Sequence, residues 1–206
     1  MNTEILPASS LATLPRALEI LRRGGLVAFP TDTVYGVGAL AFDAAAVESI
    51  YTAKGRPEEK AIPILIGEAE DLSKVASEVP AMAARLAARF WPGPLTLVVP
   101  KHSTLPQAVS ALPTVGVRLP DHPVARALLI AAGPMAVTSA NRSGQFSPAT
   151  AQEVLSQLGG RIGLILDGGK TPGGIPSTVV DCTGEEPRII REGPVSAGEI
   201  YRVWGQ

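Results

Sequence analysis

The chain has 206 residues, of which 46% are apolar and 18% charged, and its 18 basic and 19 acidic residues give a formal net charge of −1. A chain of this length fits one domain that buries about 70% of the surface of its unfolded state, so we expect a single domain over residues 1–206. The near-zero net charge argues against nucleic-acid binding through bulk electrostatics, and an aromatic content of 4% argues against a stacking platform for single strands.

The first half of the chain predicts three helices and three short strands. Pro15 lies in the first turn of a helix predicted over residues 13–23, and Gly24 follows it directly, as is typical of a helix end. Asp43 occupies the N-cap position of a second helix, which ends near Lys54. The other predicted segments of this half are an alanine-rich helix at 80–90 and apolar strands at 26–29, 62–66 and 95–99.

The second half contains two sequence signatures of helix starts. Thr150 and Glu153 have the spacing of a capping box, and Ser196 with Glu199 repeats the pattern before a short terminal helix. The predicted segments are helices at 123–132 and 150–158 and strands at 115–119, 135–138, 164–166, 178–180 and 188–190. Helices and strands intermix without strict βαβ alternation, which favours an α/β fold with an open, twisted sheet of mixed direction and flanking helices.

Other features of the sequence exclude several classes of protein. No stretch approaches the ~20 consecutive apolar residues of a membrane span, and residues 1–15 lack the basic start of a secretory signal. Cys182 is the one cysteine, so no internal disulfide forms, and His102 and His122 are too far apart to predict a zinc site. We expect a cytoplasmic protein in which Cys182 is a core residue.

Three polar clusters lie beside predicted apolar segments. They are FPTDTVYG at 29–36, KGRP at 54–57 and TSAN at 138–141. Together they supply hydroxyls, a tyrosine, two fixed cations and an amide, which suits an anionic substrate that must be oriented. Because no Gly-x-Gly-x-x-Gly or Walker loop is present, nucleotide phosphates would have to be held by side chains and turn amides.

The first cluster allows two interpretations. Pro30 fixes φ, and Asp32 or Thr33 can bond a local amide, so the segment fits a simple β-turn in which the tyrosine only packs. Alternatively, Thr31 and Tyr35 supply directional hydroxyls for an amino-acid pocket beside unobstructed glycine backbone.

The second cluster places two cations at a predicted helix end. Lys54 and Arg56 can simply complement the helix dipole, a stabilisation of ~0.3–1 kcal/mol. They also suit a phosphate clamp, because lysine offers a compact charge and arginine a planar fork that matches phosphate oxygens.

The third cluster and Arg118 follow buried strands, where ligand sites of open α/β sheets are found. Arg118 ends an apolar strand and must find a partner, either Asp121 or the carboxylate of an amino-acid substrate. Ser139 and Asn141 suit hydrogen bonding to a phosphate or carbamate. Since no histidine neighbours Ser139 in sequence, we expect no covalent nucleophile.

The ordered motifs FPTDTVYG, KGR, TVGVRLPDHP, TSAN, PSTVVD and IIREGP resemble the YrdC-like family of L-threonylcarbamoyladenylate synthases, in its short, single-domain form, over about residues 17–193. Six motifs in order are far more specific than any one of them. The resemblance implies a fold with a concave basic surface and a nucleotidyltransferase that converts L-threonine, bicarbonate and ATP into threonylcarbamoyl-AMP and pyrophosphate. That product serves the N6-threonylcarbamoyladenosine modification of tRNA.

The resemblance also implies two sets of contacts. ATP is expected to contact Lys54, Arg56, Thr114, Ser139, Asn141, Ser147 and Arg191. L-Threonine is expected to contact Thr31, Tyr35, Arg118, Val137 and Ser177.

Mg²⁺ is the expected cofactor, held by triphosphate oxygens and water rather than by protein ligands. tRNA and tRNA-modification proteins are possible partners, and a membrane is not. One alternative function is a non-catalytic module that binds tRNA or double-stranded RNA through the cations Lys54, Arg56, Lys60, Arg118 and Arg142. Another is a related enzyme that uses a different acyl or carbamoyl substrate.

Overall fold

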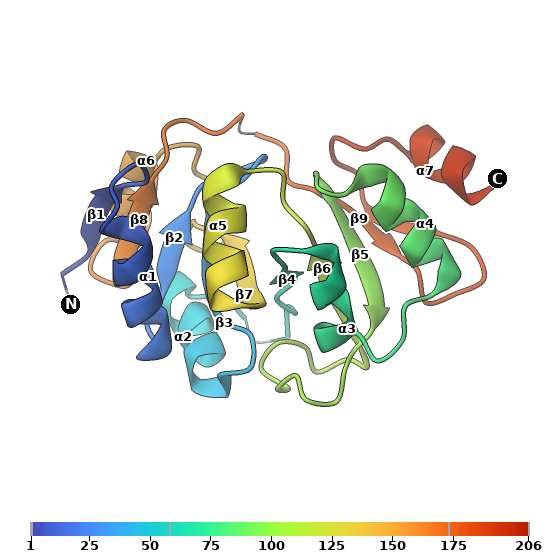
Figure 1. Cartoon of the computed structure of the whole chain (residues 1–206), viewed down its shortest axis with the longest axis horizontal. Helices are drawn as coiled ribbons and strands as arrows, with labels where there is room; N and C mark the ends of the chain where they lie inside the picture. Colours follow the sequence, from blue (N-terminus) through green and yellow to red (C-terminus); the bar gives the residue numbers. More distant parts are fainter. Residues whose placement is uncertain (1, 58, 173, 206) are drawn as a thin grey trace.

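The computed structural model describes residues 2–57, 59–172 and 174–205. Within them, ten strands form one sheet in the order β1-β8-β2-β3-β7-β4-β6-β5-β9-β10, and the chain ends lie at opposite ends of the long axis (Figure 1). The strands are β1 (Glu4–Pro7), β2 (Val27–Phe29), β3 (Gly36–Leu40), β4 (Ile64–Leu65), β5 (Leu95–Pro100), β6 (Thr114–Arg118), β7 (Met135–Ser139), β8 (Leu164–Asp167), β9 (Thr178–Asp181) and β10 (Arg188–Arg191).

The helices agree with the sequence signals for their ends. They are α1 (Thr13–Arg22), α2 (Ala44–Lys54), α3 (Leu72–Val75) after the 3₁₀ turn η1 (Ala69–Asp71), α4 (Ala81–Phe90), α5 (Pro123–Ala132), α6 (Ala151–Leu158) and α7 (Ala197–Trp204). The Asp43 side chain accepts from the Ala46 amide at the start of α2. Both predicted capping boxes are present, at the starts of α6 and α7.

The sheet is mixed, as predicted. The β1–β8, β2–β8, β4–β6 and β5–β9 pairs are parallel, and the other pairs are antiparallel. With β1 and β10 at its edges, the sheet is open rather than closed into a barrel. The predicted α/β fold class is therefore confirmed.

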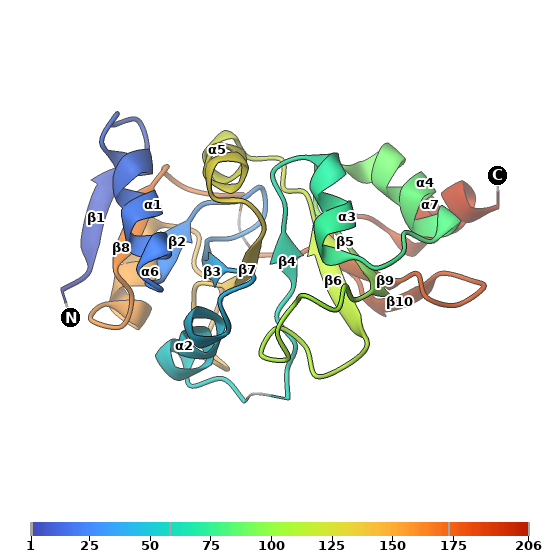
Figure 2. The same ribbon diagram turned by 60° about the horizontal axis from the view of Figure 1, so that its bottom comes forward.

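Each face of the sheet has its own apolar core. On one face, Leu21 of α1 and Leu128 of α5 pack with Phe29 and Met135. The larger core, which includes Ile50 of α2, covers the other face. Figure 2 shows α5 and α2 on opposite sides of the strands. Among the described residues, the core beneath α1 and α5 contains no side chain of β6, β5 or β9. These strands can therefore carry a site on that face of the sheet.

Strands β1 and β3 and the η1–α3 segment were missed from the sequence. For β3 the reason lies in Gly36 and Gly38, since glycine is depleted in strands. A Cβ at Gly36 would lie 2.7 Å from Cγ1 of Val137, and a Cβ at Gly38 would lie 2.6 Å from the Ala136 carbonyl oxygen. The glycines therefore permit close contact between β3 and β7.

Candidate functional site

A cavity of about 420 Å³ lies over strands β7, β4, β6, β5 and β9. Side chains two residues apart on a strand face the same side, and such pairs from β7, β6 and β5, with Leu65 of β4 between β7 and β6, form its floor. The floor residues include Val137 and Ser139 of β7, Gly116 and Arg118 of β6, and Thr96 and Val98 of β5. Its other lining comes from Thr31, Thr33, Val34, Gly36, Arg56, Ala61, Ile62, Pro63, Leu65, Thr138, Pro176, Ser177, Val179, Ile190 and Arg191.

The structure brings seven of the predicted site residues together in this lining. They are Thr31, Arg56, Arg118, Val137, Ser139, Ser177 and Arg191. The other five, Lys54, Tyr35, Thr114, Asn141 and Ser147, lie outside it. The predicted threonine contacts are thus assembled in one cavity except for Tyr35, whereas the predicted ATP contacts are divided.

Arg118 is held by three contacts at the end of β6. Its Nε donates to the Gly93 carbonyl (3.0 Å) and its Nη1 to Oγ1 of Thr33 (3.1 Å), while Nη2 forms an ion pair with Asp32. Asp32, rather than the predicted Asp121, is therefore the structural partner. Burial lowers the pKa of Arg118 and the Asp32 charge opposes this shift, so the guanidinium remains charged.

The 31–34 turn positions that ion pair. The Thr31 hydroxyl donates to the Val34 carbonyl (2.6 Å) and accepts from the amides of Thr33 (3.2 Å) and Val34 (3.3 Å). The segment is thus a local turn, but Thr31 bonds the amides rather than the predicted Asp32 or Thr33. Because the Thr31 hydroxyl proton is bonded to the Val34 carbonyl inside the turn, a ligand would contact other atoms of the Thr31 side chain.

Two further arginines border the cavity. Arg56 donates to the carbonyls of Lys60 (3.2 Å) and Ala61 (3.0 Å), and Arg191 donates twice to the Ser177 carbonyl (3.1 and 2.8 Å). A guanidinium has five N–H donors, so each arginine retains donors for a ligand. Since no carboxylate is among the described lining residues, the cavity favours an anion.

Lys54 anchors the turn after β7. Its Nζ donates to the carbonyls of Ser139 and Asn141, and the residue is only 2% exposed. Asn141 shapes the same turn by donating to the carbonyls of Arg142 and Gln145 (both 2.8 Å). Lys54 also borders a separate cavity of about 440 Å³. Its position therefore supports the turn that contains Ser139, and its ammonium does not line the 420 Å³ cavity.

This buried lysine predicts a pH effect on stability. Burial, aided by the Arg56 charge, lowers the pKa of Lys54 from 10.5 to about 7. Between these values the unfolded chain binds the extra proton, so Lys54 makes unfolding less favourable as pH rises. From pH 7 to 9, we expect the free energy of unfolding to rise by about 2 kcal/mol more in the natural protein than in Lys54→Met. Urea unfolding at both pH values measures this difference, and parallel pH dependences would contradict it.

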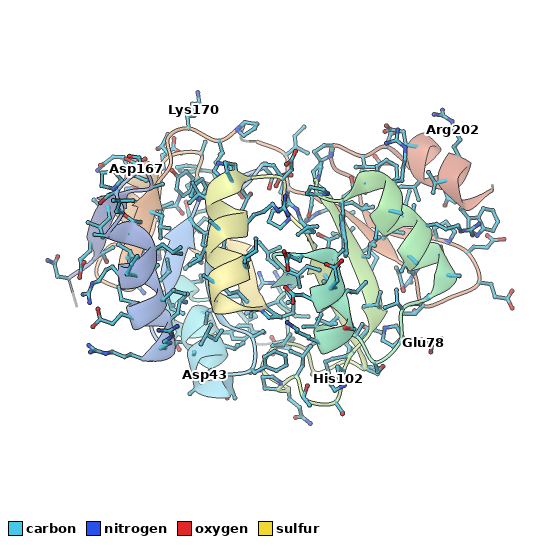
Figure 3. All side chains as sticks on the ribbon, in the orientation of Figure 1. Asp43, Glu78, His102, Asp167, Lys170 and Arg202 are labelled. Carbon is cyan, nitrogen blue, oxygen red and sulfur yellow. The ribbon has the colours of Figure 1, made fainter. Side chains whose placement is uncertain are left out.

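Tyr35 holds the segment that follows β8. It is fully buried, its hydroxyl donates to the Gly169 carbonyl (2.7 Å), and the Gly168 amide donates to that hydroxyl (3.3 Å). Burial raises the pKa of Tyr35 to about 12. Lys170 projects outward from this segment (Figure 3), which continues to Pro176 and Ser177 at the cavity. The Tyr35 hydroxyl thus binds protein backbone rather than facing the cavity.

Removal of this hydroxyl should loosen the segment. In Tyr35→Phe, we expect a loss of about 1 kcal/mol of unfolding free energy, because Gly168 and Gly169 are exposed and can bond water instead. Amide hydrogen exchange at residues 168–170 should become faster. Tyr201→Phe, at a partly exposed tyrosine of α7, is the control. Unchanged exchange in Tyr35→Phe would refute the role of its hydroxyl.

The described residues hold no cluster of metal-ligating side chains. Across 2–57, 59–172 and 174–205, no three His, Cys, Asp or Glu side chains gather to hold an ion. Asp32 has a buried Oδ2 without a hydrogen-bond partner among them, and its charge pairs with Arg118. Mg²⁺ usually takes one or two carboxylates and keeps several waters beside substrate phosphates, so an ion held mainly by a triphosphate is compatible with these residues.

Within the described residues, no helix is long and apolar enough to cross a membrane.

The sequence did not identify several residues of the site, among them Asp32 and Thr96. Asp32 was considered only as a turn residue, yet it pairs with an arginine 86 positions away. Thr96 lies within the apolar strand LTLVVP and resembles a core residue there. The one available signal was a hydroxyl in an otherwise apolar strand.

Comparison with known proteins gives a match to one family and to relatives that are longer than this chain. The Sua5/YciO/YrdC family model, described as telomere recombination, matches residues 19–193. The threonylcarbamoyl-AMP synthase of Pyrococcus abyssi is 46% identical over 192 residues, which cover 92% of this chain and 56% of that protein. The Bacillus subtilis protein of the same name is 43% identical over 195 residues, 93% of this chain and 56% of that protein. The chain thus spans about half the length of these curated relatives.

A solved structure has the same fold. The crystal structure of P. abyssi Sua5 complexed with L-threonine matches with a TM-score of 0.92 and 43% identity, over 99% of this chain and 60% of that chain.

Proposed function

Because the chain belongs to the Sua5/YciO/YrdC family, we propose that it is an L-threonylcarbamoyladenylate synthase, which joins L-threonine, bicarbonate and ATP into threonylcarbamoyl-AMP and releases pyrophosphate. The observation that supports this most is the position of Arg118 on the floor of a cavity shared with Ser177, Val137 and two more arginines. A guanidinium fixed by protein contacts can grip a substrate carboxylate.

The proposed chemistry has two steps. The amine of L-threonine and bicarbonate form a carbamate with loss of water, and a carbamate oxygen then attacks the α-phosphorus of ATP as pyrophosphate leaves. Both steps bring anionic groups together in the site. Positioning of the reactants and electrostatic stabilisation of their charge can therefore accelerate the reaction without a covalent enzyme intermediate. We assign Arg118, Thr31, Val137 and Ser177 to the amino acid.

The nucleotide would lie beside the amino acid. Arg56 and Arg191 retain guanidinium donors at the cavity and suit phosphate oxygens. Ser139 lines the cavity, while Lys54 and Asn141 support its turn. We propose that Mg²⁺ enters on the triphosphate, because this ion usually keeps several waters and needs only one or two protein carboxylates beside substrate phosphates. Thr114 and Ser147 remain predictions for ATP.

The product would feed the N6-threonylcarbamoyladenosine modification of tRNA, with tRNA-modification proteins as partners and a cytoplasmic location. The alternative RNA-binding module receives less support. Lys54 and Arg118, two of its five cations, are 2% and 6% exposed, and a duplex backbone needs accessible charges.

A turnover assay tests the proposal. The protein is incubated with ATP, Mg²⁺ and bicarbonate plus L-threonine, L-serine or L-valine, while pyrophosphate and the mass of any adenylate are followed. We expect pyrophosphate release that requires both L-threonine and bicarbonate. Release without an amino acid, or equal release with all three, would contradict the proposed substrate.

A further inference from the structure

We propose that Thr96 is a positioning residue that turns the hydroxyl proton of Ser177 into the cavity, where Ser177 donates it to the carboxylate of the bound amino acid. The inference rests on the proposed function and extends it to a residue within the β5 strand. Thr96 itself is 4% exposed, and it acts through its neighbour.

The two neighbours of β5 fix the orientation of Thr96. β5 lies between β6 and β9, and Thr96 is in register with Val179 of β9. Its Cγ2 methyl points toward β6, where a Cβ on Gly116 would lie 3.1 Å away. Its Oγ1 lies 2.8 Å from Oγ of Ser177. A β-branched side chain has few χ1 options, so the rotamer that points the methyl toward Gly116 also places the hydroxyl beside Ser177.

The direction of this hydrogen bond follows from the donors around Ser177. Nη2 of Arg191 lies 3.3 Å from Oγ of Ser177, and arginine can only donate. If Thr96 donates as well, both lone pairs of Ser177 are used and its own proton is free. In the opposite direction, Ser177 would give its proton to Thr96 and would have none left for a ligand. We therefore take Thr96 as the donor and Ser177 as the group that faces the ligand.

The surroundings identify the ligand group. Ser177 lines the cavity with Arg118 and Arg191, and Arg191 donates to the Ser177 carbonyl (2.8 Å) and lies 3.3 Å from its Oγ. A free hydroxyl proton beside two cations suits a carboxylate, which only accepts hydrogen bonds.

The test compares Thr96→Val, Thr96→Ser, Ser177→Ala and the double variant Thr96→Val/Ser177→Ala, each first shown to be folded. We expect Ser177→Ala to raise the KM for L-threonine about 10- to 100-fold, the range for one hydrogen bond to a charged group, and Thr96→Val, which only frees the Ser177 hydroxyl from its orientation, to raise it by part of that factor. In Thr96→Val, kcat and the KM for ATP should stay within about twofold. Thr96→Ser keeps the hydroxyl and should stay within about threefold of the natural KM. The double variant should match Ser177→Ala, because Thr96 acts through Ser177.

L-2-Aminobutyrate, which lacks the side-chain hydroxyl of threonine, separates the two polar ends of the substrate. Its KM should rise in Thr96→Val by the same factor as that of L-threonine. A rise for L-threonine alone would overturn the assignment to the carboxylate. A natural KM in Thr96→Val, or a double variant that shows the product of the single effects, would overturn the role of Thr96. If the natural protein shows no threonine-dependent turnover, the proposed function itself fails, and this inference with it.

Discussion

Replacing Arg118 with methionine should abolish threonine-dependent turnover and lower the free energy of unfolding by about 3–5 kcal/mol. The activity loss follows because Arg118 is the fixed cation on the cavity floor. The stability loss follows because Asp32, whose side chain is 13% exposed, would be left without its ion-pair partner. Its Oδ2 already has no hydrogen bond among the described atoms. Turnover kinetics and urea unfolding measure the two effects.

A double variant separates the two effects of Arg118. Asp32→Asn in the Arg118→Met background removes the unpaired charge, so at least half of the lost stability should return. Turnover should remain absent, because no guanidinium is present to bind the carboxylate. Active Arg118→Met protein, or a double variant no more stable than Arg118→Met, would contradict this account of the ion pair.

Replacing Lys54 with methionine should lower kcat/KM for ATP by about 100-fold, although Lys54 does not line the 420 Å³ cavity. The loss equals roughly 2.7 kcal/mol and follows because the Ser139 and Asn141 carbonyls lose their shared donor. Hydrogen exchange at residues 139–145 should become faster. Lys60→Met, at an exposed lysine of the same region, should change neither quantity.

These measurements distinguish positioning from direct phosphate binding by Lys54. If Lys54 acts by holding the turn, the loss of activity accompanies faster exchange at 139–145. A loss of ATP binding with unchanged exchange would instead identify a direct phosphate contact. Natural kcat/KM in Lys54→Met would contradict both roles.

Local sequence signals predicted the fold where one short segment decides the structure. Asp43 and the two capping boxes depend on residues three positions apart, and all three helix starts were confirmed. Strand β3 was missed because its glycines are needed for close contact with β7, which lies about 100 residues later in the chain. Propensity contains no information about such a contact.

In the site, too, features with local signals were predicted and contacts between distant residues were not. Arg118 was predicted because a cation that ends an apolar strand needs a partner, but nearness in sequence favoured Asp121 over the distant Asp32. Lys54 resembles an exposed cation at a helix end, and only the packing of the 139–141 turn against it shows its burial. Tyr35 and Thr31 occupy one motif, yet only Thr31 lines the cavity. Sequence therefore identified seven residues that line one cavity, but it did not identify the partner that each side chain contacts.

The most direct test of this account is a crystal structure of the chain with L-threonine bound. We expect the amino acid in the 420 Å³ cavity, with its carboxylate bonded to Arg118 and to the hydroxyl of Ser177. L-Threonine in the cavity beside Arg142 and Gln157, or bound without contact to Arg118, would contradict the account.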